Sequence, residues 1–423
     1  MSATAGTSAF QVLVARADGS LEEVPGLRPA ARSGRRVVPL EPRELIPLPE
    51  GTTLAHLPGR TAVALDGRGA AVGLDGMLPV AAILPVGHLR TLLPASTPAS
   101  RAPRLPLFGY TAVAVSRGRP MAAALRTDTL DWWDPGLFRS ADLAAAVDAA
   151  RVALPGNRLV DHLAICALEH NCYTAQNTFH RRHEGALPAS PACNADCLGC
   201  ISLQSEGEAP APQPRMGFAP TPEELADLAS YHLAGADAPI VSFGQGCEGE
   251  PLTRADALEE ATVLIRRRHP DATIHVNTNG SSPRALARLV AAGCNSVRIS
   301  AISFTDAVFR AYYRPLGYGL DDVVGCGEVM AGAGGQVCLN LLTFPGVTDA
   351  PDELERTVRA CSRMGVAQVQ WRSLNVDHDW LAGRLPEMEP GIGMRAALQA
   401  LRNRLPTVEH GNFTRPSVHP HTR

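Results

Sequence analysis

The chain has 423 residues, of which 45% are hydrophobic and 19% charged, and its formal net charge is −3. This length exceeds that of most single domains, so we expect two domains, and the small net charge excludes a broad basic surface for nucleic acid or anionic lipid. All 39 basic residues are arginine, which excludes lysine Schiff-base chemistry. Because there is no long apolar run and no signal-peptide pattern, we expect a cytoplasmic protein without a membrane span.

Residues 1–130 predict a small β-rich domain. Short apolar segments alternate with Asp-Gly and Arg-Gly pairs, as in RTAVALDGRG at 60–69 and AAVGLDGM at 70–77. Such pairs between alternating segments are typical of hairpins. This region contains no recognisable catalytic constellation, so its role stays open.

Residues 131–187 predict a helical connector. The spacing of apolar residues favours helices over 141–154 and 158–182, and the proline-rich stretch EGALPASPA follows at 184–192. We place the start of the next domain at residue 188, where this stretch leads into a group of cysteines.

Residues 188–405 alternate between apolar strands and amphipathic helices. Predicted strands cover 239–245, 273–280, 296–302, 336–344 and 367–375, with a further short strand before Cys193. About six strand–helix units predict an α/β fold, a partial (β/α)6 TIM-like barrel around a parallel sheet. In such barrels the chemistry lies at the carboxyl ends of the strands. Residues 406–423 are expected to form a flexible tail.

Three cysteines, Cys193, Cys197 and Cys200, lie within eight positions at the start of this barrel. A structural zinc site usually needs four ligands, and no fourth cysteine or histidine follows closely. A [4Fe–4S] cluster can instead be held through three of its irons, which leaves the fourth iron open to a small molecule. The spacing and the barrel pattern together indicate such a cluster.

The C-x3-C-x2-C spacing resembles the signature of the radical S-adenosylmethionine (radical SAM) superfamily. The resemblance covers residues 188–380, about half of the chain, and leaves residues 1–130 outside it. It implies an enzyme in which S-adenosylmethionine binds the open iron. An electron from the reduced cluster then cleaves this cofactor to methionine and a 5′-deoxyadenosyl radical, which abstracts hydrogen from a substrate. It also implies a reductant such as ferredoxin or flavodoxin.

The resemblance extends to several strand ends. The GEP segment at 249–251, the TNG turn at 278–280 and the R-x-S segment at 298–300 are similar to superfamily motifs that contact S-adenosylmethionine. Polar residues at the end of the sixth strand add further candidates, among them Arg372 and Asn375. The residues predicted to bind the cofactor are Gly249, Glu250, Asn279, Arg298, Ser300 and Gln370.

Two positions depart from the superfamily pattern, and simpler roles exist for some candidates. Gly199 stands where an aromatic residue often precedes the third cysteine, and TFPG at 343–346 replaces a glycine-rich stretch. Glu250 could also be a carboxylate at a helix N-terminus, Asn279 a turn former and Ser300 an ordinary strand residue.

The other cysteines are interpreted as structural. Cys247 is read as a small loop residue, although it could ligate a second cluster or donate hydrogen to a substrate radical. Cys166 and Cys172 have histidines nearby and could hold an auxiliary cluster or zinc, but helical spacing does not place them on one face. Four more are expected to be buried small hydrophobic residues: Cys294, Cys326, Cys338 and Cys361.

The substrate is predicted less directly than the cofactors. By architecture we expect a peptide or protein, recognised by the β-rich domain. RNA is the alternative, although the slight negative charge and the lack of lysine argue against a strong phosphate-binding surface. A third reading is a non-catalytic iron–sulfur electron carrier or sensor, which would have no need for an open iron.

Overall fold

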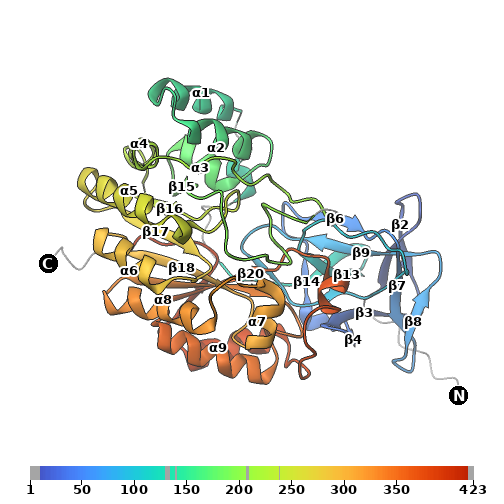
Figure 1. Cartoon of the computed structure of the whole chain (residues 1–423). Helices are drawn as coiled ribbons and strands as arrows, with labels where there is room; N and C mark the ends of the chain where they lie inside the picture. Colours follow the sequence, from blue (N-terminus) through green and yellow to red (C-terminus); the bar gives the residue numbers. More distant parts are fainter. Residues whose placement is uncertain (1–9, 129–133, 139–140, 206–208, 238, 418–423) are drawn as a thin grey trace, which may run out of the picture.

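The computed structural model describes residues 10–128, 134–138, 141–205, 209–237 and 239–417. A β-rich part, a short helical segment and an α/β part follow one another along the chain, and the β-rich part lies beside the α/β part (Figure 1). We retain the division at residues 130, 187 and 405 as a proposal. Within the described residues, none of the helices has the length and apolar character needed to cross a membrane.

The β-rich part consists of two antiparallel sheets, which confirms the predicted fold of this region. One sheet has the order β10-β14-β13-β9-β1-β2, with β5 on β14 and β6 on β9; the other has the order β11-β3-β7-β12, with β4 on β3 and β8 on β7. The strands are β1 (Val12–Ala15), β2 (Leu21–Val24), β3 (Arg28–Ser33), β4 (Arg36–Pro39), β5 (Leu45–Pro47), β6 (Thr53–His56), β7 (Arg60–Leu65), β8 (Ala71–Leu74), β9 (Leu78–Ile83), β10 (His88–Arg90), β11 (Leu93–Pro94), β12 (Ser96–Pro98), β13 (Tyr110–Ser116) and β14 (Arg119–Arg126), with the 3-10 turn η1 (Pro42–Glu44).

The helical segment contains η2 (Pro135–Phe138), α1 (Leu143–Ala153), α2 (Arg158–Leu168) and α3 (Tyr173–His180). The helix predicted over 158–182 is therefore two helices. The reason is local, because Asn171 adopts a left-handed conformation with φ 49°, which asparagine tolerates better than most residues. The chain reverses there, and α3 begins after Cys172.

The α/β part is built on a parallel sheet with strand order β15-β16-β17-β18-β19-β20-β21. Helices α4, α5, α6, α8 and α9 cover its outer face (Figure 1), the arrangement of a partial barrel. The strands are β15 (Glu184–Leu187), β16 (Ile240–Phe243), β17 (Thr273–Thr278), β18 (Ser296–Ala301), β19 (Gln336–Thr343), β20 (Gln368–Ser373) and β21 (Glu409–Gly411). The helices are α4 (Pro222–Leu233), η3 (Pro251–Arg254), α5 (Ala255–Arg268), α6 (Pro283–Ala292), α7 (Asp306–Tyr313), α8 (Leu320–Gly332), α9 (Pro351–Met364), α10 (His378–Ala382) and α11 (Met394–Arg404).

The carboxyl end of the chain differs from the prediction. The prediction of a flexible tail is wrong for residues 406–417, because β21 pairs with β20 and adds a seventh strand to the expected six. Asn412 and Phe413 are buried. The Asn412 amide donates to the Asp128 carboxylate at 2.8 Å, so the β-rich part holds this segment in place. Residues 418–423 lie outside the described residues.

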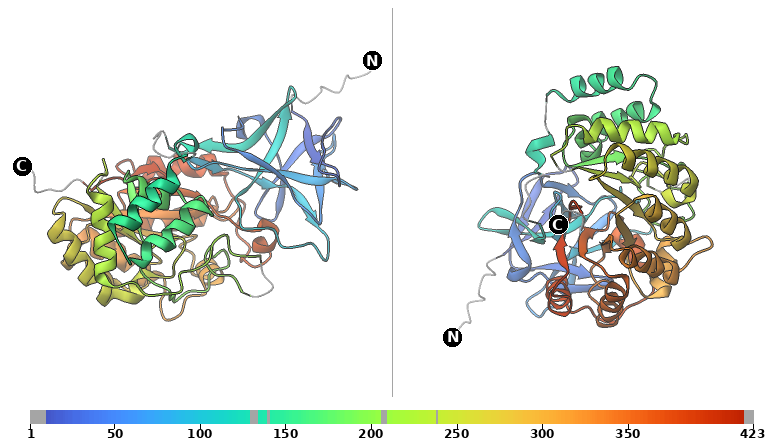
Figure 2. Two further views of the ribbon diagram at one scale, coloured as in Figure 1. Left: turned by 90° about the horizontal axis from the view of Figure 1, so that it is seen from above. Right: turned by 90° about the vertical axis from the view of Figure 1, so that its left-hand side faces the viewer.

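Buried ion pairs join the β-rich part to the loop after β20 and to α10, which follows it. The Arg60 guanidinium donates to the carboxylates of Asp377 at 2.6 Å and Asp379 at 2.9 Å, and Arg32 also pairs with Asp379. The fully buried Arg90 donates to the carbonyl of Leu374 at 3.2 Å. Figure 2 shows the two parts in contact from two further directions. The β-rich part therefore lies directly beside the carboxyl ends of β19 and β20.

Candidate functional site

A cavity of about 430 Å³ lies at the carboxyl ends of the parallel strands. Eight of the nine predicted site residues contribute to its wall. They are Cys193, Cys197, Cys200, Gly249, Glu250, Asn279, Arg298 and Ser300. The barrel topology brings them together from loops and strands that are far apart in the sequence.

The cysteine loop is held against the end of α7. The amides of Leu198 and Asp196 donate to the carbonyls of Tyr312 at 3.0 Å and Tyr313 at 3.1 Å. A Cβ atom added to Gly199 would lie 2.8 Å from the Tyr312 hydroxyl. The space beside Gly199 is thus taken by a tyrosine from another element. The sequence did not identify Tyr312 as a site residue, because its neighbours in α7 do not distinguish it from an aromatic residue of the core.

The surroundings of the three thiols differ. The Arg215 guanidinium lies 3.4 Å from the Cys200 sulfur, and the Ser202 hydroxyl lies 3.6 Å from it. Burial raises the pKa of Cys193 and raises that of Cys197 well above its ordinary value. A cation or cluster bound by these two thiols would counter that effect by stabilising their thiolates.

The three thiols face one shared space. Cys193, Cys197 and Cys200 all line the same cavity. Three cysteines on one short loop can hold three irons of a [4Fe–4S] cluster.

The loop after β16 is tied to the cysteine loop through its backbone. The amides of Gly249 and Glu250 donate to the carbonyls of Ser190 at 2.7 Å and Ala192 at 2.8 Å. A Cβ atom on Gly249 would lie 1.9 Å from the Ala192 oxygen, so only glycine permits this approach. The residue that precedes Cys193 is thereby fixed by the loop that carries Glu250.

The Glu250 carboxylate links that loop to the end of β17. It accepts hydrogen bonds from the Thr278 hydroxyl at 2.6 Å, the Asn279 amide at 2.8 Å and the Leu252 amide at 3.0 Å. Burial raises its pKa to about 7. The side chain therefore caps η3, as the simpler reading proposed, and also reaches the cavity wall.

The buried Glu248 carboxylate connects the loop after β16 to the segment that follows β15. Its carboxylate accepts hydrogen bonds from the amides of Ala189 and Ser190, both at 2.8 Å, and of Gln245 at 2.6 Å. Burial raises its pKa to about 8. A glutamate here joins the end of β15 to the loop after β16, so its role is to hold these segments together.

An unpredicted asparagine completes the wall near Ser300. The Asn340 amide donates to the Ser300 hydroxyl at 2.9 Å. Its buried Oδ1 atom has no hydrogen-bond partner within the described part of the chain. Such an acceptor at a cavity wall suits a hydroxyl donor of a bound molecule. The sequence feature that could have identified Asn340 is its position as a polar residue within the otherwise apolar segment of β19, QVCLNLLT.

Gln370 is the one predicted site residue that does not reach the cavity wall. It is fully buried and accepts a hydrogen bond from the Arg298 guanidinium at 3.0 Å. Gln370 lies on the same face of β20 as Arg372 but nearer the amino end of the strand, and there it orients Arg298. Arg372 and Asn375 from the same region do line the cavity.

A second cavity of about 200 Å³ lies where the β-rich part meets the sheet. It shares Arg372, Ser373 and Asn375 with the first cavity. Phe108 and His88 from the β-rich part contribute to its wall. The β-rich part thus borders the space next to the predicted cofactor site.

Comparisons with known proteins agree with this geometry. Residues 187–361 match the model of the Radical SAM superfamily. No curated protein sequence matches the chain. The matched residues include the three cysteines and most of the strand ends that line the larger cavity.

Several solved structures share low similarity with the chain. SuiB from Streptococcus suis, bound to the precursor peptide SuiA, is 12% identical, with 50% of this chain and 43% of that chain covered and a TM-score of 0.33. The methyltransferase TsrM from Kitasatospora setae is 16% identical, with 45% and 36% covered and a TM-score of 0.34. The hydrogenase maturase HydG from Carboxydothermus hydrogenoformans is 16% identical, with 63% and 64% covered and a TM-score of 0.38. The chain therefore spans less than half the length of the first two.

The superfamily predicted from the cysteine spacing is the one whose model matches, and the expected α/β fold is present. Residues 187–361 therefore form a domain that matches the radical SAM superfamily, whose enzymes use a [4Fe–4S] cluster and S-adenosylmethionine.

Proposed function

We propose that Cys193, Cys197 and Cys200 hold three irons of the [4Fe–4S] cluster and that S-adenosylmethionine occupies the cavity beside them. When bound, these cofactors supply an electron and a 5′-deoxyadenosyl radical. The support is that all three thiols border one cavity together with a buried carboxylate, an arginine and an unpartnered amide oxygen. These groups match the amino, carboxylate and hydroxyl groups of the cofactor.

In this proposal, side chains that are themselves held by hydrogen bonds position the cofactor. The Glu250 carboxylate, fixed by three donors, offers negative charge to an ammonium group. Arg298, oriented by Gln370, offers positive charge to a carboxylate. The Oδ1 atom of Asn340 accepts from a ribose hydroxyl, and Tyr312 beside Gly199 supplies an aromatic side chain at the wall.

We further propose that the substrate is a peptide or protein, and the observation that carries this is the apolar rim around the two cavities. Phe108 is 44% exposed and Ile201 is 36% exposed. Ile201 lines the larger cavity and Phe108 the smaller one. Exposed apolar groups around a polar cavity suit peptide side chains.

Two arginines at the carboxyl end of α7 are paired with carboxylates and offer little attraction for phosphate. The Arg314 guanidinium pairs with Asp196 at 2.8 Å, and that of Arg310 pairs with Asp306 at 2.7 Å. An RNA-binding surface would need arginines free to contact the backbone. The radical formed in the larger cavity would thus act on a hydrogen of a peptide that enters between the α/β part and the β-rich part.

The cluster assignment is tested by anaerobic reconstitution of the full chain. We expect four irons and four sulfides per chain, and a change in the electron paramagnetic resonance spectrum of the reduced cluster when S-adenosylmethionine is added. A Cys193→Ala/Cys197→Ala/Cys200→Ala variant should lack both, while Cys361→Ala, which removes a buried thiol far from the cavity, should keep them. A triple variant with full iron content would overturn the assignment.

The substrate class is tested with fractionated extract of the source cells. The reconstituted enzyme is mixed with extract that has been treated with protease or with ribonuclease, each then removed. We expect the extract to stimulate 5′-deoxyadenosine formation, and protease treatment to abolish that stimulation. Loss after ribonuclease but not after protease would instead favour RNA and contradict the peptide proposal.

A further inference from the structure

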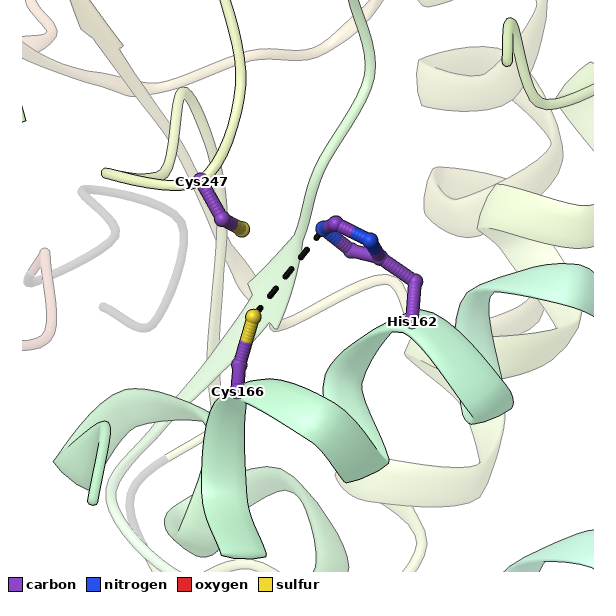
Figure 3. A group of neighbouring side chains, drawn as sticks. All are labelled: His162, Cys166 and Cys247. Carbon is purple, nitrogen blue, oxygen red and sulfur yellow. Dashed lines mark hydrogen bonds between the residues drawn. The ribbon is translucent and has the colours of Figure 1, made fainter. Parts of the chain in front are cut away.

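Three potential metal ligands meet beside the loop that carries Glu250. His162 and Cys166 lie one turn apart on α2, and Cys247 comes from the loop after β16. Figure 3 shows the two sulfur atoms and the imidazole directed toward one point. Both thiols are buried, and His162 is half-buried. Sequence reasoning considered Cys166 with Cys172 and did not connect either to Cys247, because the contact is long-range.

The spacing of these ligand atoms matches a single metal ion. The His162 Nε2 and Cys166 Sγ atoms are 4.0 Å apart, and all three ligand atoms lie within 4.8 Å of one another. A tetrahedral zinc ion, with bonds of about 2.3 Å to sulfur and about 2.1 Å to nitrogen, places neighbouring ligands roughly 3.6–3.8 Å apart. Small rotations of these side chains would therefore suffice to bind an ion.

The chemistry of the set also favours a metal of the zinc class. Two thiolates and one imidazole are ligands that zinc binds, in preference to the carboxylates and carbonyls that suit magnesium or calcium.

The second set of close ligand atoms does not compete with this one. Asp377, His378 and Asp379 also lie within 4.8 Å of one another. However, Arg60 already pairs with both carboxylates. A set neutralised by arginine offers little for a cation, whereas neither thiol of the first set faces a cation that is always charged.

We propose that His162, Cys166 and Cys247 form a zinc-binding site, separate from the cluster cysteines, that joins α2 to the loop carrying Gly249 and Glu250. The fourth position is open to water or to Cys172, the half-buried residue that precedes α3. The Cys247 carbonyl also accepts a hydrogen bond from the Met216 amide at 2.8 Å. Zinc at this site would hold the helical segment, the 216–218 segment and the loop after β16 together.

The test uses a full-length background that cannot hold the cluster, so that it does not depend on the proposed function. The Cys193→Ala/Cys197→Ala/Cys200→Ala variant is incubated with zinc, dialysed and analysed for metal. We expect one tightly bound zinc per chain. Adding Cys166→Ser and Cys247→Ser should remove it, while the matched control Cys361→Ser, a buried thiol of α9, should retain it.

Cobalt gives a second readout that a misfolded variant cannot mimic. Cobalt(II) added to the same background should produce the visible and thiolate charge-transfer absorption of a tetrahedral thiolate site. His162→Ala, at the half-exposed side of the set, should weaken cobalt binding at least tenfold while circular dichroism stays unchanged. The proposal is overturned if zinc and cobalt still bind after Cys166→Ser and Cys247→Ser. It is also overturned if reconstitution with iron assembles a cluster on these residues, or if the two cysteines form a disulfide in protein kept under reductant.

Discussion

Gly249 shows how one residue connects the loop that carries Glu250 to the cysteine loop. Its Cα lies so close to the backbone before Cys193 that a Cβ atom would be 1.9 Å from the Ala192 oxygen. Backbone atoms cannot yield to such an overlap without a shift of the loop. We therefore expect Gly249→Ala to move Cys193 and to reduce the iron bound after reconstitution several-fold, as measured by iron and sulfide analysis.

The control for this change is Gly217→Ala. A Cβ atom at Gly217 would have no neighbour within 4 Å, so iron content and thermal stability should stay at the level of the unchanged protein. Full iron content in Gly249→Ala would contradict the proposed connection between the two loops.

At the scale of elements, the loop after β20 depends on buried charge from the β-rich part. Arg60 contacts the carboxylates of Asp377 and Asp379, and all three side chains are at most 5% exposed. Removing Arg60 leaves the buried Asp377 carboxylate without its ion-pair partner and leaves Asp379 with Arg32 alone, and breaking a buried pair costs about 3–5 kcal/mol in comparable cases. We expect Arg60→Ala to lower the thermal unfolding midpoint strongly and to increase proteolysis between the two parts.

A surface arginine of the same part provides the comparison. Arg28 pairs with Glu41 at 3.6 Å, and both side chains are 44–50% exposed, so Arg28→Ala should change stability by less than about 1 kcal/mol. Equal effects of the two substitutions would show that the buried pairs do not hold the β-rich part in place.

At the scale of the whole molecule, buried histidines make the fold sensitive to acid. Burial lowers the pKa of both His232 and His275 to about 4. Below the ordinary value of 6.5 the unfolded chain binds protons that the folded chain excludes, so the free energy of unfolding falls as pH decreases from 6.5 toward 4. The loss is roughly 3 kcal/mol per histidine at most.

This prediction is checked by urea unfolding of the cluster-free protein at several pH values. The carboxyl groups of Glu248 and Glu250 act in the opposite direction, because burial raises their pKa values to about 8 and 7. The comparison is therefore made with His275→Gln, whose stability should decline less between pH 6.5 and 5. Parallel pH profiles for the two proteins would exclude His275 as a source of the acid sensitivity.

The sequence predicted the elements better than the contacts between them. The cysteine spacing, the strand ends and the barrel follow from local patterns, because apolar periodicity and motif spacing are local properties. Tyr312 beside Gly199 and Cys247 beside Cys166 depend on packing between distant segments, which no local pattern encodes. The tail was misjudged for a similar reason, since β21 is stabilised by pairing with β20 and by contact with Asp128.

The most direct test of the whole account follows reductive cleavage of S-adenosylmethionine. The reconstituted enzyme is reduced with dithionite under anaerobic conditions, and 5′-deoxyadenosine is measured by chromatography. We predict that the full chain forms this product and that the Cys193→Ala/Cys197→Ala/Cys200→Ala variant forms none. A fully loaded cluster that neither cleaves S-adenosylmethionine nor changes its spectrum in its presence would contradict the account and would indicate an electron carrier or sensor.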